Sequence, residues 1–182
     1  MITHKSKTRF VMSDIFSTTA HLVKSQNLGT SIIIPHVCNN IGVFGAGFAA
    51  AVRNHFPIVA TNFELLGTKT KLGYVQYISV FKDPTYNHEL IFANMIAQNG
   101  IINYKNQRPL NYEALVKCMT DIRLYIDKSN KEKIEIHCPK FGSGLAGGNW
   151  NFISELINDI WNNISVIVYG YKNANAKKSN KF

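Results

Sequence analysis

Short apolar segments alternate with segments of helical periodicity along most of the chain. Strands are predicted where β-branched and aromatic residues gather, at Phe10–Met12, Ser31–Val37, Gly73–Val80, Leu90–Ala97, Lys133–Cys138 and Ile164–Tyr169. Helices are predicted at Gly47–His55, after Pro57, at Pro109–Asp127 and at Trp150–Asn162. Because strands alternate with helices, the pattern predicts a three-layer α/β/α fold with a mixed, largely parallel central sheet.

Two of the predicted helices have recognisable ends and apolar faces. We expect Pro109 to lie in the first turn of one helix and Asn149 to cap the other. The predicted buried face of the first consists of Leu115, Met119, Leu124 and Ile126. That of the second consists of Phe152, Ile153, Leu156, Ile157, Ile160 and Trp161. Ligands of such sheets bind beyond the carboxyl ends of the strands, so functional residues are expected in the loops that follow strands.

The composition is typical of a folded cytoplasmic protein. Of 182 residues, 46% are hydrophobic and 17% charged, and no apolar run is long enough to span a bilayer. The first residues lack the apolar core of a secretory signal. Cys38, Cys118 and Cys138 are odd in number and widely spaced, which favours reduced thiols over disulfides or a zinc site. We therefore expect a cytoplasmic location (the host cytoplasm for a viral protein) and no metal or cofactor.

The net charge of +9 is concentrated at the two ends of the chain. Met1–Phe10 and Lys172–Phe182 hold seven basic residues and no acidic one, whereas Val11–Tyr171 has a net charge of only +2. A basic groove on the folded surface is not implied, although the two ends could hold the protein near nucleic acid. We predict a basic end at 1–9, a single domain at 10–171, and a disordered Lys/Asn-rich tail at 172–182.

Two glycine-rich segments each lead from a strand into a helix. His36–Val52 passes from an apolar strand through Asn39 and Asn40 into three glycines and an alanine-rich helix. Cys138–Trp150 places four glycines before the helix that Asn149 caps. Glycines let the backbone approach a ligand closely, and free N–H groups before a helix favour an anion. A structural turn needs fewer glycines, so both segments favour phosphate binding, although neither fits the dinucleotide or P-loop motif.

In this order, the segment Asp14–Phe16 and the two glycine-rich segments resemble the macrodomain family, which binds ADP-ribose. The resemblance extends from about Asp14 to Tyr169, and is greatest to the branch of ADP-ribose-1″-phosphate phosphatases and ADP-ribosyl-glutamate hydrolases, with similar sequences in phages. It implies that Asp14, the Ile15 backbone and Tyr171 contact the adenine, although Asp14 also suits a turn or cap residue before Ser17 and Thr18. The residues implied near the distal ribose and its phosphate are Asn39, Asn40, Gly45, Ala46, Gly47 and Phe48. Those implied to hold the diphosphate are Gly142, Ser143, Gly144, Leu145 and Ala146.

The resemblance implies a catalytic role for His36, since the phosphatases carry a histidine near this position. A histidine of near-neutral pKa could activate water or protonate a leaving group, but His36 suits a buried strand end equally well. The lysine and aspartate of the glutamate-linkage hydrolases are replaced by Gln98 and Ala146, so that activity is not expected. Cys38 is expected to be a core thiol rather than a nucleophile.

The sequence therefore predicts an ADP-ribose-binding domain that removes phosphate from ADP-ribose 1″-phosphate. Three alternatives remain open: a reader that binds ADP-ribose or ADP-ribosylated protein without turnover, a hydrolase of another linkage such as ADP-ribosylated nucleic acid, and nucleic-acid binding alone. No paired carboxylates or metal-ligand spacing accompany the glycine-rich segments. The expected partner is thus ADP-ribose or a derivative, and not a membrane.

Overall fold

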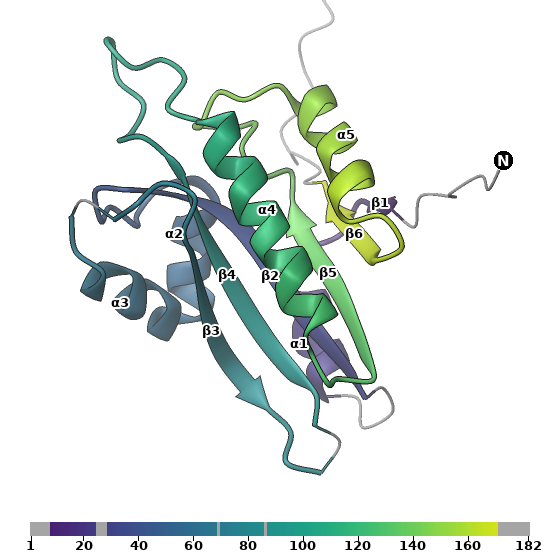
Figure 1. Cartoon of the computed structure of the whole chain (residues 1–182). Helices are drawn as coiled ribbons and strands as arrows, with labels where there is room; N and C mark the ends of the chain where they lie inside the picture. The colour runs from purple at the N-terminus through teal and green to yellow at the C-terminus, as the bar shows by residue number, and fades with distance from the viewer. Residues whose placement is uncertain (1–7, 25–28, 69, 86, 171–182) are drawn as a thin grey trace, which may run out of the picture.

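The six predicted strands form one sheet with the order β1-β6-β5-β2-β4-β3 (Figure 1). The computed structural model describes residues 8–24, 29–68, 70–85 and 87–170. The strands are β1 (Thr8–Val11), β2 (Thr30–Asn39), β3 (Val75–Lys82), β4 (Glu89–Gln98), β5 (Lys133–Pro139) and β6 (Ser165–Tyr169). All neighbours are parallel except β3, which pairs antiparallel with β4 at the edge. The prediction of a mixed, largely parallel sheet is confirmed.

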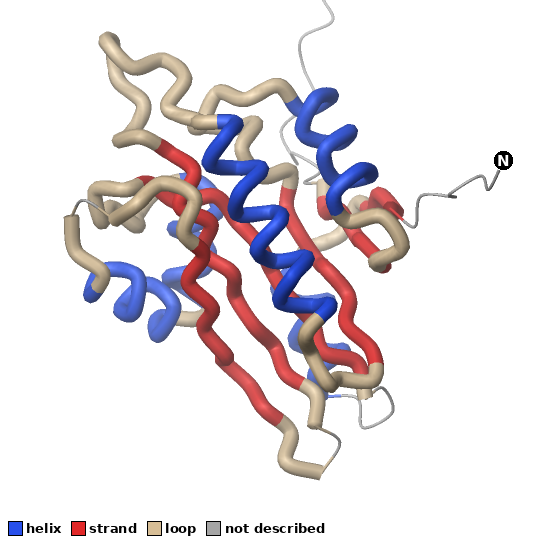
Figure 2. Tube along the Cα trace, viewed as in Figure 1, coloured by secondary structure: helices blue, strands red, loops and turns tan. Residues whose placement is uncertain are grey.

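Helices cover both faces of the sheet (Figure 2). One face packs against α4 (Tyr112–Asp127) and α5 (Trp150–Ile160). The other packs against α1 (Ile15–Lys24), α2 (Gly47–His55) and α3 (Pro57–Leu65). The chain therefore has the three layers that the alternation of strands and helices predicts.

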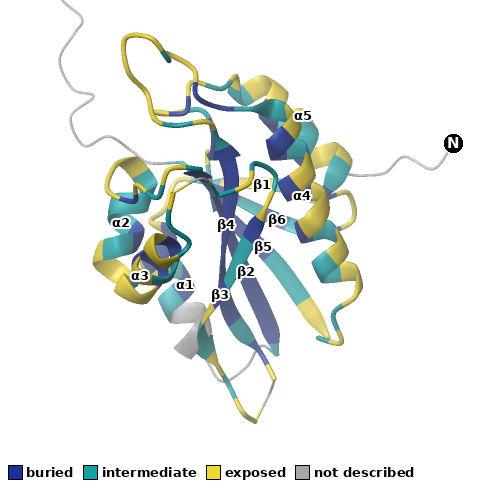
Figure 3. Cartoon of the chain, turned by 60° about the vertical axis from the view of Figure 1, so that its left-hand side comes forward, coloured by how far each residue is buried: buried dark blue, intermediate teal, exposed yellow. Residues whose placement is uncertain are grey.

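The central strands β2 and β4 are buried on both faces (Figure 3). Side chains alternate along a strand, so Ile33 and Ile91 enter the core under α4 and α5, whereas Ile34 and Phe92 enter the core under α1, α2 and α3. Burial on both faces explains why both strands are nearly continuous apolar runs. Burial of each such side chain contributes about 2 kcal/mol to the free energy of folding. The rigid pair β2–β4 carries the loops at its carboxyl ends.

Helix α1 was not expected from the sequence. Its first turn is capped by Asp14, whose carboxylate accepts hydrogen bonds from the N–H groups of Phe16 and Ser17 at 3.4 and 2.9 Å. Thr19 lies in the middle of α1, and its hydroxyl donates a hydrogen bond to the Ile15 carbonyl oxygen. This side-chain hydrogen bond lowers the intrinsic helix preference of the segment. Burial of Ile15 and Phe16 against the sheet overrides that weak preference.

Two details of α4 and α5 also differ from the prediction. Helix α4 begins at Tyr112 rather than Pro109, because the Asn111 side chain accepts the N–H of Ala114 at 2.9 Å and so caps the helix there. Leu124 and Phe152, both expected in the buried faces, are 49% and 43% exposed. The predicted Asn149 cap of α5 is confirmed by its bonds to the N–H groups of the first turn.

Within the described residues, no helix combines the length and the apolar character needed to cross a membrane. The basic end, most of the Lys/Asn-rich tail and the predicted adenine contact Tyr171 lie outside the described residues. The three cysteines are buried free thiols, and no group of metal-ligating side chains occurs in the part of the chain that the structure describes.

Candidate functional site

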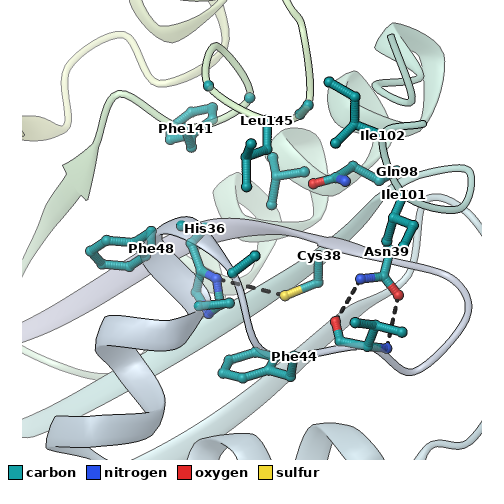
Figure 4. A pocket seen from close by; sticks show the side chains of 18 of the residues that line it. His36, Cys38, Asn39, Phe44, Phe48, Gln98, Ile101, Ile102, Phe141 and Leu145 are labelled. Carbon is teal, nitrogen blue, oxygen red and sulfur yellow. Dashed lines mark hydrogen bonds between the residues drawn. The ribbon is translucent and has the colours of Figure 1, made fainter. Parts of the chain in front are cut away.

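A cavity of about 400 Å³ opens beyond the carboxyl ends of β2, β4 and β5 (Figure 4). Two loops frame it: loop 1, residues 40–46, joins β2 to α2, and loop 2, residues 140–149, joins β5 to α5. The side of loop 1 and α2 contributes Val43, Phe44, Gly45, Ala46, Gly47, Phe48 and Ala49. Loop 2 contributes Lys140, Phe141, Gly142, Gly144, Leu145 and Ala146. The strand ends and the segment after β4 complete the lining with His36, Val37, Cys38, Asn39, Gln98, Ile101, Ile102 and Pro139.

Loop 1 presents a row of backbone donors to this cavity. Among the described residues, no N–H group from Phe44 to Ala49 has a hydrogen-bond partner. Ala46 is the N-cap of α2, and no side chain caps the helix. The first N–H groups of a helix and the positive end of its dipole favour an anion. The start of α2 is therefore suited to a negatively charged group inside the cavity.

Loop 2 presents a second row of backbone donors. No N–H group from Gly142 to Ala146 has a hydrogen-bond partner within the described ranges. The carbonyl groups hold the loop instead, since Gly148 donates to the Gly142 carbonyl at 2.8 Å and Leu110 donates to the Ala146 carbonyl at 3.1 Å. This arrangement leaves the donors of loop 2 available to a ligand.

The glycines of the two loops fall into two groups. Gly148 is required by the fold, because a Cβ atom there would lie 2.6 Å from the Gly142 carbonyl oxygen and would overlap the Leu110 side chain. By contrast, a Cβ atom at Gly45 or Gly144 would meet no protein atom within 4 Å, and neither residue has a positive φ. Both line the cavity. No contact within the protein requires glycine at these two positions. A ligand that lies close to the backbone would require it, because a Cβ atom would then occupy the ligand's space.

Comparison with known proteins identifies the fold. No family model matches the chain. An uncharacterised 17.5 kDa protein of Enterobacteria phage T4 is 24% identical over 143 residues, which is 76% of this chain and 86% of the phage protein. A structure of unknown function from Bacteroides thetaiotaomicron is 29% identical, with a TM-score of 0.70 over 89% of this chain and 96% of that one. A macrodomain protein from Streptomyces coelicolor is 27% identical, with a TM-score of 0.66 over 91% and 99%. The chain has the macrodomain fold.

The same fold occurs in a solved complex. Thermosipho africanus DarTG in complex with ADP-ribose matches this structure with a TM-score of 0.66 over 94% of this chain and 43% of that one. The identity is 18%, so this likeness concerns the fold alone.

The two asparagines at the carboxyl end of β2 shape loop 1. Asn39 lines the cavity, and its side chain accepts the N–H groups of Ile41 and Val43 at 3.1 Å each and donates to the Val43 carbonyl. Asn40 lies off the cavity, where its side chain joins Asn99 and the N–H of Gly100. Both amides therefore fix the loop, and only Asn39 is close to the predicted ligand.

His36 lies at the cavity wall inside an aromatic enclosure. Its ring contacts Phe44, Phe48 and Phe92 edge-on at centroid distances of 5.6, 5.4 and 6.3 Å, and the residue is 1% exposed. Burial lowers the pKa of His36 to about 4. The imidazole is therefore neutral at physiological pH, and the alternative of a buried residue at a strand end agrees with this position. The catalytic role of His36 stays a prediction.

The thiol of Cys38 is the polar neighbour of the His36 ring. Cys38 Sγ lies 3.6 Å from His36 Nδ1, and burial raises the pKa of Cys38 well above its ordinary value, so that the thiol keeps its proton. The thiol can donate to Nδ1 when that nitrogen carries no proton. A protonated, buried thiol is a poor nucleophile, in agreement with the expectation that Cys38 is a core residue.

A row of polar side chains that was not predicted from the sequence continues from His36 across the sheet. His36, Asn94 and Gln76 occupy paired positions on β2, β4 and β3. Asn94 donates to Gln76 at 3.0 Å, and Gln76 donates to the Asn62 carbonyl of α3 at 3.0 Å. The Asn94 side chain also partly offsets the effect of burial on the His36 pKa. The available signal was a lone asparagine inside the apolar run of β4.

Three further predicted site residues, Asp14, Ile15 and Ser143, do not line the cavity. Asp14 caps α1; burial opposes the shift, but the N–H and hydroxyl of Ser17 lower the pKa of Asp14. Ile15 is buried in the core, and the Ser143 hydroxyl donates to the Lys140 carbonyl at 2.9 Å. Among the described residues that line the cavity none is Asp or Glu, and the positions of Gln98 and Ala146 are uncharged.

Proposed function

We propose that this macrodomain binds ADP-ribose, or a derivative of it, in the cavity between loop 1 and loop 2. One observation carries the proposal: two rows of unpartnered N–H groups, at 44–49 and 142–146, belong to one cavity whose described lining contains no carboxylate. A diphosphate needs many donors and no competing negative charge. The complex of Thermosipho africanus DarTG with ADP-ribose, which has the same fold, supports this choice of ligand.

The proposed orientation follows the sequence predictions. The diphosphate lies against residues 142–146, and the distal ribose with any attached phosphate lies against Gly45–Phe48 beside Asn39. The adenine lies towards Asp14 and the Ile15 backbone, with Tyr171 as its stacking partner. The cap role of Asp14 is compatible with this, because each carboxylate oxygen has two lone pairs and can accept the adenine amino group as well as a backbone N–H.

Calorimetric titration with ADP-ribose tests the proposal. The wild type should bind with one site, and Gly144→Ala should weaken binding about tenfold, because a new methyl group occupies ligand space at a cost of about 1.4 kcal/mol. The same variant should unfold at the wild-type urea concentration, since its methyl group meets no protein atom within 4 Å.

Gly67→Ala is the matched control with the opposite pattern. Gly67 lies at the end of α3, away from the cavity lining, and has a φ of 70°. Alanine there should lower the free energy of unfolding by about 1 kcal/mol and leave ADP-ribose binding unchanged. If Gly144→Ala binds ADP-ribose like the wild type, the ligand does not approach loop 2 and the proposed orientation is wrong.

A second candidate is the removal of phosphate from ADP-ribose 1″-phosphate. The observation that favours it is the position of His36 at the cavity wall, two residues along β2 from Cys38 and next to loop 1. In this reaction water attacks the phosphorus atom and the products are ADP-ribose and inorganic phosphate. A neutral His36 could accept a proton from water at its unprotonated ring nitrogen, but at neutral pH it lacks the second, imidazolium proton that a general acid would give the leaving oxygen.

Phosphate release separates this candidate from a reader that binds without turnover. The phosphatase proposal expects inorganic phosphate to accumulate with the wild type and not with His36→Gln. Tight binding of ADP-ribose 1″-phosphate without phosphate release would favour the reader, as the absence of carboxylates among the described lining residues does. Hydrolysis of another linkage is tested by incubating ADP-ribosylated protein or nucleic acid with the wild type and with His36→Gln and measuring the ADP-ribose released.

A further inference from the structure

Lys140 occupies a special position among the cations of this protein. It follows directly after β5, opens loop 2, and is the one residue with a charged side chain among the described residues that line the cavity. The anion site described above consists otherwise of backbone donors. The positive charge of Lys140 therefore needs a partner of opposite charge or an aromatic ring.

No carboxylate does so within the described residues. The ion pairs of the protein involve other cations, among them Lys82, Lys117 and Lys131, and none involves Lys140. The segments that surround the cavity, 36–56, 98–112 and 136–154, contain no Asp or Glu at all. Acidic residues are thus kept away from this edge of the sheet although the described part of the chain is almost balanced in charge.

An aromatic ring holds the Lys140 ammonium instead. Its Nζ lies 5.8 Å from the centroid of Trp150, the first residue of α5. Trp150 in turn contacts Phe141, which lines the cavity, at a centroid distance of 6.3 Å. Cation–π contacts at exposed positions are weak, whereas a charge-assisted hydrogen bond to phosphate is among the strong ones, so an ammonium in this position would exchange the ring for a phosphate oxygen.

We propose that Lys140 is a side-chain ligand of the diphosphate that loop 2 holds. This inference rests on the proposed function and deepens it: the backbone donors of residues 142–146 position the diphosphate, and the Lys140 ammonium supplies its countercharge. The flexible four-carbon stem lets the ammonium turn from Trp150 towards the ligand, and the absence of acidic residues around the cavity leaves it available.

Titration of ADP-ribose into the wild type, Lys140→Ala, Lys140→Arg and Lys128→Ala tests this. Lys128 ends α4, is exposed and does not line the cavity, so its variant removes the same charge elsewhere. Lys140→Ala should weaken ADP-ribose binding about tenfold and flatten its dependence on salt concentration. Lys140→Arg should restore both properties, and Lys128→Ala should match the wild type.

The outcomes separate this inference from the proposed function. Thermal unfolding of each variant first confirms that the fold is intact. If the wild type binds ADP-ribose and Lys140→Ala binds equally well with the same salt dependence, Lys140 is not a ligand, while the proposed function stands. If Lys128→Ala weakens binding as much as Lys140→Ala, net charge explains the effect and the inference is wrong. If the wild type does not bind ADP-ribose, both are wrong.

Discussion

The buried imidazole of His36 makes the stability of this protein depend on pH. In the unfolded chain a histidine binds its proton below the ordinary pKa of 6.5, whereas burial delays protonation of folded His36 until about pH 4. Below pH 6.5 the unfolded state therefore binds more protons than the folded state. Stability should be constant above this pH and should fall as the pH falls towards 4.

The magnitude follows from the two pKa values. Their difference corresponds to a full loss of about 3 kcal/mol, of which about 2 kcal/mol is already lost at about pH 5. His36 is 1% exposed, so solvent screening does not reduce this figure appreciably. A loss of this size is a large part of the stability of an ordinary domain.

Urea unfolding at about pH 7.5 and about pH 5 measures the effect. His36→Gln cannot titrate, so its loss of stability between the two pH values should be about 2 kcal/mol smaller than that of the wild type. Buried His137 is present in both proteins, so its contribution cancels. His55→Gln, which removes an exposed histidine of α2, controls for the loss of one imidazole. Equal pH dependence in the wild type and His36→Gln would refute the assignment of His36 as a buried neutral group.

Two further predictions concern the ends of loop 2. Gly148→Ala should lower the free energy of unfolding by about 2 kcal/mol, seen in urea unfolding, because its Cβ atom would overlap Leu110 and approach the Gly142 carbonyl; an unchanged midpoint would contradict this packing. Asn149→Ala should cost about 1 kcal/mol, seen in thermal unfolding, because the first turn of α5 loses its cap; a melting temperature equal to that of the wild type would show that the cap contributes nothing.

The regular elements of the fold were readable because their patterns are strong. The apolar runs of β2 and β4 reflect burial on both faces, and the glycine-rich segments stand between a strand and a helix in both cases. Helix α1 escaped prediction because its sequence has weak helical preference and is held by Asp14 and by packing on the sheet. Pro109 suggested that α4 begins there, but the side chain of Asn111 caps the helix, which therefore begins at Tyr112.

The candidate site was readable only in part. Periodicity and glycine content identify the loops but not which glycines face open space, so Gly45 and Gly144 became distinct from Gly148 only in three dimensions. The polar row through Asn94 joins three strands, and no local pattern reveals such a contact. In the same way, the small net charge of the domain conceals that acidic residues avoid the segments around the cavity and Lys140.

The central claim is that the backbone donors of loop 1 and loop 2 hold one diphosphate ligand. Amide nuclear magnetic resonance of the labelled protein during titration with ADP-ribose tests it most directly, because each N–H group reports its own hydrogen bond. We expect the largest shifts at residues 44–49 and 142–146, in both rows together and at the same ligand concentration. Binding of ADP-ribose that leaves the amides of both rows unmoved, or no change in any amide, would contradict the account.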